Sequence, residues 1–333
     1  MDKNASVRRR LIKASLSTSA CAAFSPGLSL AQNPPWPSRP IRMVVPWPAG
    51  GLVDIAARQL ASRLQTALGQ PVVIENRVGA GGSVGSEHVA RAAADGHTLL
   101  FATSSLTVSA ALQTRASFRP MQDLQPVALV ANAPSILVAG PSIQVNTVKD
   151  LLELAHRRPG QLTYASAGIG SFAHLVVERF KAENRIFAVH VPYTGAPGAM
   201  NDQLAGRIDF QMANITVALP HVRSGRVKAL AITSRERFSG LPDTPTMIEA
   251  GIQDFEADQW LGLLAPQGLP AAVSDRLSAE VNRALGDPAL RETLQNAGIQ
   301  LATPTSTVAF DGLVKAEFAR WQQVVRTQNL RMD

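Results

Sequence analysis

The sequence is poor in the residues that build covalent cross-links and metal sites. Its 333 residues include one cysteine, Cys21, which excludes a disulfide within the chain. A zinc site would also lack most of the cysteine ligands that such sites commonly use. None of the six histidines stands in an H-E-x-x-H or similar spacing, so we expect neither a metal nor a cofactor. Outside the N-terminal segment, no apolar run approaches the ~18 residues that a membrane helix needs.

The motifs of common catalytic and nucleotide-binding folds are also missing. No G-x-S-x-G nucleophile elbow occurs, because residues 165–168 read A-S-A-G and lack the leading glycine. No G-x-x-x-x-G-K-[ST] occurs. We therefore expect a protein without catalysis. The alternative is an exported hydrolase-like enzyme that acts on a small carboxylate through Ser166, Ser171 or Ser104 and one of the histidines.

The charge of the chain is modest. Lys and Arg number 32 and Asp and Glu 25, which gives +7. Residues 1–31 hold five of the basic residues and one acidic residue, so 27 basic and 24 acidic residues, or +3, lie beyond them. No dense Lys/Arg patch interleaved with aromatics occurs there, and we expect no nucleic-acid partner. A mildly basic body suits small anionic ligands.

Residues 1–31 have the pattern of an export signal peptide. A basic stretch ends in Arg8-Arg9-Arg10, a modestly apolar stretch follows, and residues 29–31 (S-L-A) form a small-x-small cleavage site. Residues 8–13 also fit the twin-arginine pattern, and export by Tat and by Sec both stay open. We expect cleavage after Ala31 and a periplasmic mature chain without cysteine.

Beyond this segment, short apolar runs alternate with stretches of helical periodicity. The first is a β-branched strand at 41–45, followed by a glycine turn and a helix from Leu52 that ends at Gly69. Alternation with short connections indicates sheets that are mainly parallel and flanked by helices. The alternation of strands and helices begins again after expected strands at 127–130 and 136–139. This second series indicates two α/β lobes with a cleft between them. Further strands are expected at 72–74, 98–102, 162–165, 189–191, 208–212, 227–233 and 261–266, and further helices at 84–94, 149–156, 171–181, 197–205, 271–285 and 306–327.

Three glycine turns each follow a strand and precede a helix, at 50–51, 79–82 and 168–170. Unpaired backbone N–H groups and the positive end of a helix make such a turn a seat for an anion. Open α/β sheets bind ligands beyond the carboxyl ends of their strands, so the three turns can share one cleft. Asp54, at the start of its helix, either complements the helix dipole or contacts a ligand amine or hydroxyl.

The residues around these turns resemble a known family. Residues 46–54 read P-W-P-A-G-G-L-V-D, which is similar to the P-[FW]-x-x-G-G-x-x-D opening of the Bug-type periplasmic receptors of tripartite tricarboxylate transporters. Further blocks agree in order over about residues 36 to 330: E-N-R-x-G-A-G-G (75–82), D-G-H-T-L-L (95–100), Y-A-S-A-G (164–168), V-P-Y-x-G (191–195), L-P-H (219–221), L-P-D-x-P-T (241–246) and G-L-L-A-P (262–266).

The resemblance implies a two-lobed periplasmic binding protein of type II-like fold, with residues 36–130 plus 231–333 as lobe 1 and 131–230 as lobe 2. It implies a monomeric receptor that binds a small organic carboxylate in the interlobe cleft for uptake or sensing. A tripartite membrane transporter or a sensor would be its partner. The ligand-binding residues that the turns and the resemblance assign are Trp47, Pro48, Ala49, Gly50, Gly51, Asp54, Gly81, Thr103, Ser104, Ser105, Gly168, Ile169, Gly170, Ser171, Tyr193, Thr194, Gly195 and Asn214.

Three residues of this sequence depart from the family pattern, and they bear on how polar the ligand can be beyond its carboxylate. Leu52 and Val53 stand where the family usually has hydroxyl residues, and Ile169 replaces a frequent Asn. A polar ligand group facing these side chains would lose its hydrogen-bond partners, at roughly 1 to 3 kcal/mol each. We therefore expect a monocarboxylate with an aromatic or branched aliphatic body to bind more tightly than citrate, malate or glutamate.

Overall fold

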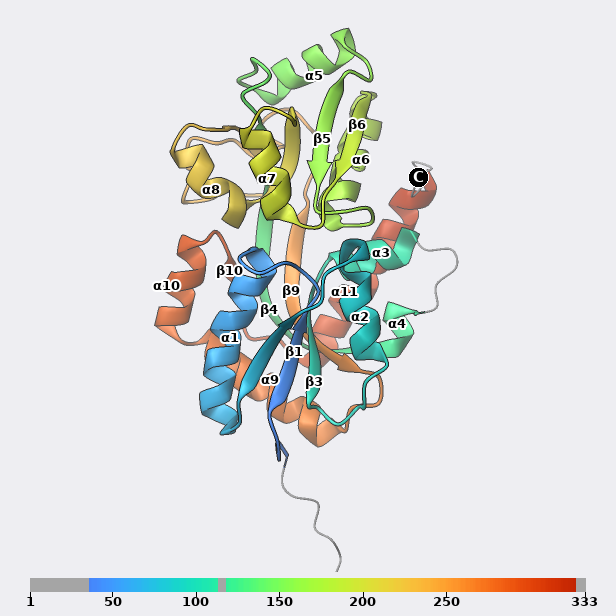
Figure 1. Ribbon diagram of the computed structural model, residues 1–333, viewed down its shortest axis with the longest axis vertical. Helices are drawn as coiled ribbons and strands as arrows, with labels where there is room; N and C mark the ends of the chain where they lie inside the picture. The colour runs from blue at the N-terminus through green and yellow to red at the C-terminus, as the bar shows by residue number, and fades with distance from the viewer. Residues whose placement is uncertain (1–35, 113–117, 328–333) are drawn as a thin grey trace, which may run out of the picture. The chain divides into compact units, whose positions relative to one another are not determined.

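The computed structural model describes residues 36–112 and 118–327. The expectations about the export signal and Cys21 lie outside these residues. Two sheets share one long strand, β4 (Leu124–Ala139). Its first part lies in a sheet of order β2-β1-β3-β9-β4, to which β10 adds on β4, and its last residues lie in a sheet of order β4-β7-β5-β6, with β8 also on β4. We call the first sheet with its helices the first lobe, and the other the second lobe (Figure 1).

The strands of the first sheet are β1 (Ile41–Val45), β2 (Val72–Asn76), β3 (Thr98–Thr103), β9 (Asp258–Pro266) and β10 (Gln300–Leu301). Those of the second are β5 (Leu162–Ser166), β6 (Ala188–Pro192), β7 (Phe210–Asn214) and β8 (Lys228–Ile232). β1 is parallel to β2 and β3, and β5 is parallel to β6 and β7. Every pairing of β4 and β9 is antiparallel, so the sheets are mixed and the expectation of mainly parallel sheets is wrong in this respect.

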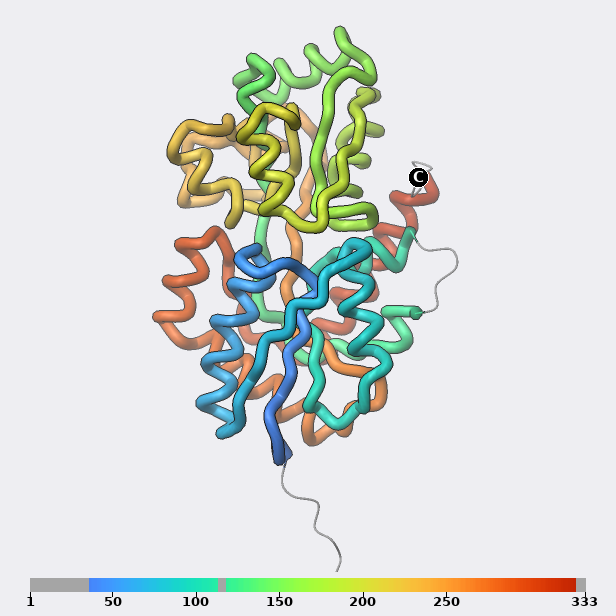
Figure 2. The backbone as a smooth tube through the Cα atoms, in the orientation of Figure 1, coloured from blue at the N-terminus to red at the C-terminus, as the bar shows by residue number. Residues whose placement is uncertain are grey.

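The helices surround the two sheets. Those of the first lobe are α1 (Leu52–Leu68), η1 (Ala80–Gly82), α2 (Ser83–Ala90), α3 (Ser105–Leu112), α4 (Pro120–Asp123), α9 (Ala271–Leu285), α10 (Pro288–Asn296) and α11 (Thr307–Thr327). Those of the second are α5 (Val148–Arg157), α6 (Phe172–Asn184), α7 (Ala196–Leu204) and α8 (Ile215–Arg223), as the tube in Figure 2 traces. The expected α/β class is confirmed.

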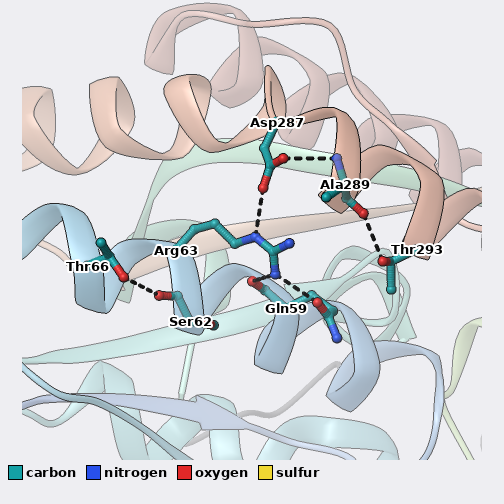
Figure 3. A network of polar contacts seen from close by, with 7 residues as sticks. All are labelled: Gln59, Ser62, Arg63, Thr66, Asp287, Ala289 and Thr293. Atoms are coloured by element: carbon teal, nitrogen blue, oxygen red, sulfur yellow. Dashed lines mark hydrogen bonds and ion pairs between the residues drawn. The ribbon is translucent and has the colours of Figure 1, made fainter.

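Helix α1 follows its sequence pattern closely. Its apolar positions recur at helical spacing and are buried, and it ends at Gly69, whose φ of 68° lies in the left-handed region that favours glycine. Arg63 on its outer part donates to Asp287 over 3.1 Å, and Asp287 also caps α10 by accepting from the backbone of Ala289 (Figure 3). These contacts hold α1 against α10.

Strand β4 was expected as two strands, at 127–130 and 136–139. The structure has one strand, in which Pro134 lies opposite Asp258 of β9. The pairing of β4 with β9 shifts register between Pro126 and Ala128 and again between Leu129 and Ala131, so β4 has two β-bulges or similar irregularities. Four α-helices, α3, α4, α8 and α10, were not predicted; α8 contains Pro220, which interrupts a helical pattern in sequence.

The two lobes have separate apolar cores. Met43, Leu100 and Leu264 belong to the first, and Tyr164 and Phe210 to the second. The second core also takes in buried residues from later in the chain: Met247, Ile252, Phe255, Ala257 and, from α11, Trp321. No helix in the described ranges is long and apolar enough to span a bilayer.

Candidate ligand-binding site

A pocket lies between the lobes and takes its walls from both. It encloses about 400 Å³ of space, open solvent at its mouth included. Six of the predicted ligand-binding residues line it: Trp47, Pro48, Gly51, Ser105, Ser171 and Asn214. The other lining residues are Leu52, Val53, Ala167, Phe172, Ala173, Ala196, Pro197 and Gln259. Leu52 and Val53, at which the sequence departs from the family pattern, are thus part of the wall of this pocket.

Three helices begin at this pocket without a side-chain cap. The residues that precede them are Gly51 for α1, Gly195 for α7 and Asn214 for α8. The first N–H groups of a helix have no partner within it, and its N-terminus carries a partial positive charge. The start of each helix contributes lining residues, so three helix N-termini lie at the pocket, although Pro197 in the first turn of α7 has no N–H and Asp54 lies in the first turn of α1.

The side chains that line the pocket are uncharged at neutral pH. All fourteen are apolar, glycine, serine or amide residues. Gln259 Nε2 donates to Asn214 Oδ1 over 3.0 Å, so each amide keeps polar groups free for a ligand. Sequence reasoning missed Gln259, which precedes the recognised G-L-L-A-P block and carries no motif of its own. An anion here would be held by backbone N–H groups and neutral side chains, without an Arg or Lys from the lining.

The turn at 168–171 uses its backbone N–H groups internally. Gly168 donates to Ser166 Oγ over 3.1 Å and Gly170 donates to His174 Nδ1 over 3.3 Å. Ser171 donates to the carbonyl of Gly168. Three of the four amides from which an anion seat was expected therefore already have partners. Of this turn, Ser171 alone lines the pocket, and the side chain of Ile169 is 39% exposed and lies outside the lining.

Two other predicted glycines lie where the lobes approach each other. A Cβ on Gly81 would stand 2.7 Å from the carbonyl oxygen of Ile169, and one on Gly195 would stand 2.6 Å from Cγ of Pro48. Neither glycine lines the pocket itself. Their missing side chains allow close packing between the lobes, which the sequence could not distinguish from an anion seat.

Asp54 holds the turn that forms one wall of the pocket. It is 2% exposed, and its Oδ2 accepts from the N–H of Gly50 and from Arg58 Nε, over 3.0 and 2.8 Å. Its Oδ1 accepts from Asn76 Nδ2, which also donates to the carbonyl of Trp47. Burial raises the pKa of Asp54, but the hydrogen bonds from Arg58, Gly50 and Asn76 outweigh it and hold the pKa below its usual value. Asp54 is not among the lining residues and positions the turn instead of contacting the ligand space.

The remaining predicted residues make contacts within their own lobes. Thr103 Oγ1 accepts from the N–H of Ser105, and Ser104 Oγ accepts from the N–H of Trp260. Tyr193 donates to Asp202 over 2.7 Å, and burial together with that carboxylate raises the pKa of Tyr193 to about 12. Ala49, Gly50 and Thr194 are likewise outside the lining of the pocket.

A serine and a histidine do meet, as the hydrolase alternative requires, but outside the pocket. Ser166 Oγ lies 2.7 Å from His190 Nε2, and it also contacts the backbone of Gly168. Ser166 is 1% exposed. His190 is stacked between Tyr164 and His174, at centroid distances of 4.8 and 4.2 Å. A buried hydroxyl that braces a turn does not reach a substrate in the pocket.

The stacked histidines should make stability fall in acid. Burial, and then the neighbouring His174, lower the pKa of His190 to about 4, from about 6.5 in an unfolded chain. Protonation therefore favours unfolding, and the contribution present above pH 6.5 is lost as the pH falls toward 4. The native chain should lose free energy of unfolding when the pH is lowered from 7 to 4.5. In the variant His190→Gln, which keeps a polar group near Ser166, this loss should be smaller by on the order of 2 kcal/mol. Denaturant titrations at both pH values measure this, and equal losses would contradict it.

Two lobes joined by long strands, with a ligand pocket between them, define the class of bilobal solute-binding proteins. Residues 56–330 match the model of the tripartite tricarboxylate transporter family receptor (TctC), and the chain belongs to this family. It is 38% identical over 301 residues to BugT of Bordetella pertussis, covering 89% of this chain and 91% of BugT. The predicted resemblance to Bug-type receptors is confirmed.

Solved structures agree. MatC from Rhodopseudomonas palustris with bound malate has a TM-score of 0.83 and 34% identity, covering 87% of this chain and all of MatC. An R. palustris protein solved with adipate has a TM-score of 0.85 and 32% identity, covering 89% and 99% of the two chains. A third similar structure is that of the periplasmic binding protein BugD, with a TM-score of 0.84 and 33% identity, covering 89% of this chain and 99% of BugD. The chain is a solute receptor and not an enzyme, which overturns the hydrolase alternative.

Proposed function

We propose that this receptor binds a small organic monocarboxylate with an apolar body in the pocket between its lobes. The observation that carries the proposal is the meeting of three uncapped helix N-termini at a pocket whose lining is uncharged. A carboxylate placed there accepts from the free N–H groups and is favoured by the helix dipoles. The malate and adipate of the structural neighbours support a small carboxylate as the ligand class.

The walls beyond the helix ends favour an apolar body. Trp47, Leu52 and Phe172 supply most of the large side chains of the lining. A second carboxylate would meet no cationic side chain among the described lining residues and would lose hydration. Asn214 and Gln259 suit one neutral polar group on the same ligand.

We also propose a cellular compartment for the receptor and the positions at which its chain crosses between the lobes. Export by Tat or Sec with cleavage after Ala31 would place a monomer in the periplasm, where it delivers its ligand to a tripartite transporter or a sensor. The change of sheet within β4 supports a first crossing between lobes at Pro134 and Ser135, a few residues beyond the predicted boundary at 130–131. The packing of Met247 and Phe255 in the second core favours a return crossing at Asp258 in place of residue 231.

A binding panel with product analysis tests the proposal. Benzoate, aromatic acetates and branched aliphatic acids are compared with malate, citrate and glutamate by thermal shift and calorimetry. A ligand at a hundredfold excess over Kd should stabilise the protein by about 2.7 kcal/mol, and mass spectrometry should recover it unchanged. Conversion to a new compound would contradict the receptor function, and tighter binding of the polar di- and tricarboxylates would contradict the ligand class.

Matched variants locate the preference in the pocket. Val53→Thr adds a hydroxyl at nearly constant volume within the lining and should narrow the preference for apolar ligands. Ile169→Asn makes a similar change at an exposed side chain outside the lining and should leave it unchanged.

A further inference from the structure

Helix α11 packs against both lobes within one helical turn. Glu317 faces α3 and β9, whereas Trp321, four residues later, lies in the core of the second lobe, to which α3 also contributes Val108 and Leu112. Residues four apart lie on the same face of a helix. Figure 1 shows α11 beside α3, from which Ser105 reaches the pocket.

On the first-lobe side, Glu317 fixes the turn that precedes Ser105. Glu317 is 7% exposed, and its Oε2 accepts from Thr107 Oγ1 over 2.6 Å and from Trp260 Nε1 over 2.5 Å. The same two residues hold Ser104: Thr107 Oγ1 lies 2.7 Å from its carbonyl oxygen, and the N–H of Trp260 donates to its Oγ over 3.0 Å. Burial raises the pKa of Glu317, and the hydrogen bonds it accepts oppose that rise. The carboxyl group thus ties α3 to β9.

On the second-lobe side, Trp321 supports Phe172. The two rings meet edge to face at a centroid distance of 6.0 Å and an angle of 82°. Phe172 is the first residue of α6, and its N–H donates to Ser105 Oγ over 3.0 Å. This hydrogen bond joins two residues of the pocket lining. Glu317 supports the turn before Ser105, and Trp321 packs against Phe172, so one side chain of α11 supports each partner.

We propose that Glu317 and Trp321 are positioning residues, which together hold the Ser105–Phe172 hydrogen bond that closes the pocket. Neither side chain lines the pocket, so both act through the residues that do. The interlobe closure of this receptor would then depend on its C-terminal helix. The inference concerns closure alone and does not depend on which ligand is bound.

Hydrogen exchange at the backbone N–H of Phe172, measured by NMR on the ligand-free full chain, tests this directly. The N–H of Leu175 is the internal control, because it lies in the same helix and donates to the carbonyl of Ser171. Ser105→Ala should raise exchange at Phe172 roughly three- to tenfold relative to Leu175, as expected for one lost hydrogen bond. Glu317→Ala and Trp321→Ala should raise it to a similar extent, whereas Glu317→Gln and Trp321→Phe should restore most of the protection.

A double-mutant cycle separates positioning from general loss of stability. If Glu317 acts through Ser105, the pair Glu317→Ala, Ser105→Ala should exchange no faster at Phe172 than Ser105→Ala alone. Val314→Ala, which opens a cavity on the same helix without touching this network, should leave the ratio of Phe172 to Leu175 unchanged. Should Glu317→Ala fail to fold, Thr107→Val removes the hydroxyl link at constant shape and should raise exchange at Phe172 in its place. An unchanged ratio in these variants, or effects of Glu317→Ala and Ser105→Ala that multiply, would overturn the proposal.

Discussion

Oxidation of a chain carrying Pro48→Cys and Gly195→Cys should form a disulfide that locks the pocket shut. A Cβ on Gly195 would lie 3.7 Å from Cβ of Pro48, within the range found in disulfides. The φ of Gly195 is 168°, an extended conformation that cysteine adopts without strain. The bond closes a loop of more than about 100 residues, so it should add about 4 kcal/mol to the free energy of unfolding. With the lobes held together, association of the ligand found in the panel should slow at least a hundredfold.

Reduction and single variants control this experiment. Cys21→Ser in every chain leaves the two introduced thiols as the only ones. Each single-cysteine variant under the same oxidant should bind as the reduced double variant does. Mass spectrometry detects the disulfide, and stopped-flow fluorescence, for which Trp47 in the lining is a reporter, gives the association rate. Failure to form the disulfide would mean that Pro48 and Gly195 do not stay in contact in solution.

Gly81→Ala should weaken ligand binding at least tenfold without unfolding the protein. The φ of Gly81 is 61°, and its new Cβ would stand 2.7 Å from the carbonyl oxygen of Ile169 and 3.2 Å from the carbonyl carbon of Gly170. Backbone on the opposite lobe cannot yield as a flexible side chain does, so the lobes must separate. The left-handed conformation itself costs about 1–2 kcal/mol of stability.

Gly69→Ala is the matched control. Its φ of 68° imposes the same backbone cost, but a Cβ there meets nothing within 4 Å and lies at the far end of α1. Both variants should lose similar stability in denaturant titrations, while calorimetry should show weaker binding for Gly81→Ala alone. Equal affinities of the two variants would show that Gly81 does not take part in closure.

The sequence predicted those elements whose structure depends on residues close together in the chain. The apolar spacing and terminal glycine of α1 gave its bounds, and the motif at 46–54 identified a wall of the pocket. The turn at 168–171 was predicted less well, because its amides are satisfied by Ser166 and His174, whose side-chain directions depend on tertiary packing. Gln259 reaches the pocket from a crossover strand whose partners are distant in sequence, and no local signal marks it.

The order of strands in the first sheet has a consequence for the order in which parts of the chain can pair during folding. β9 lies between β3 and β4, although it is made long after both. Until β9 emerges, β3 and β4 each present an open edge, which is a template for aggregation. β5 to β8 follow β4 without interruption and pair with it and with one another. Pairing of β4 with β7 and β8 is therefore expected to precede completion of the first sheet, in which β3 and β4 keep open edges until β9 pairs with both.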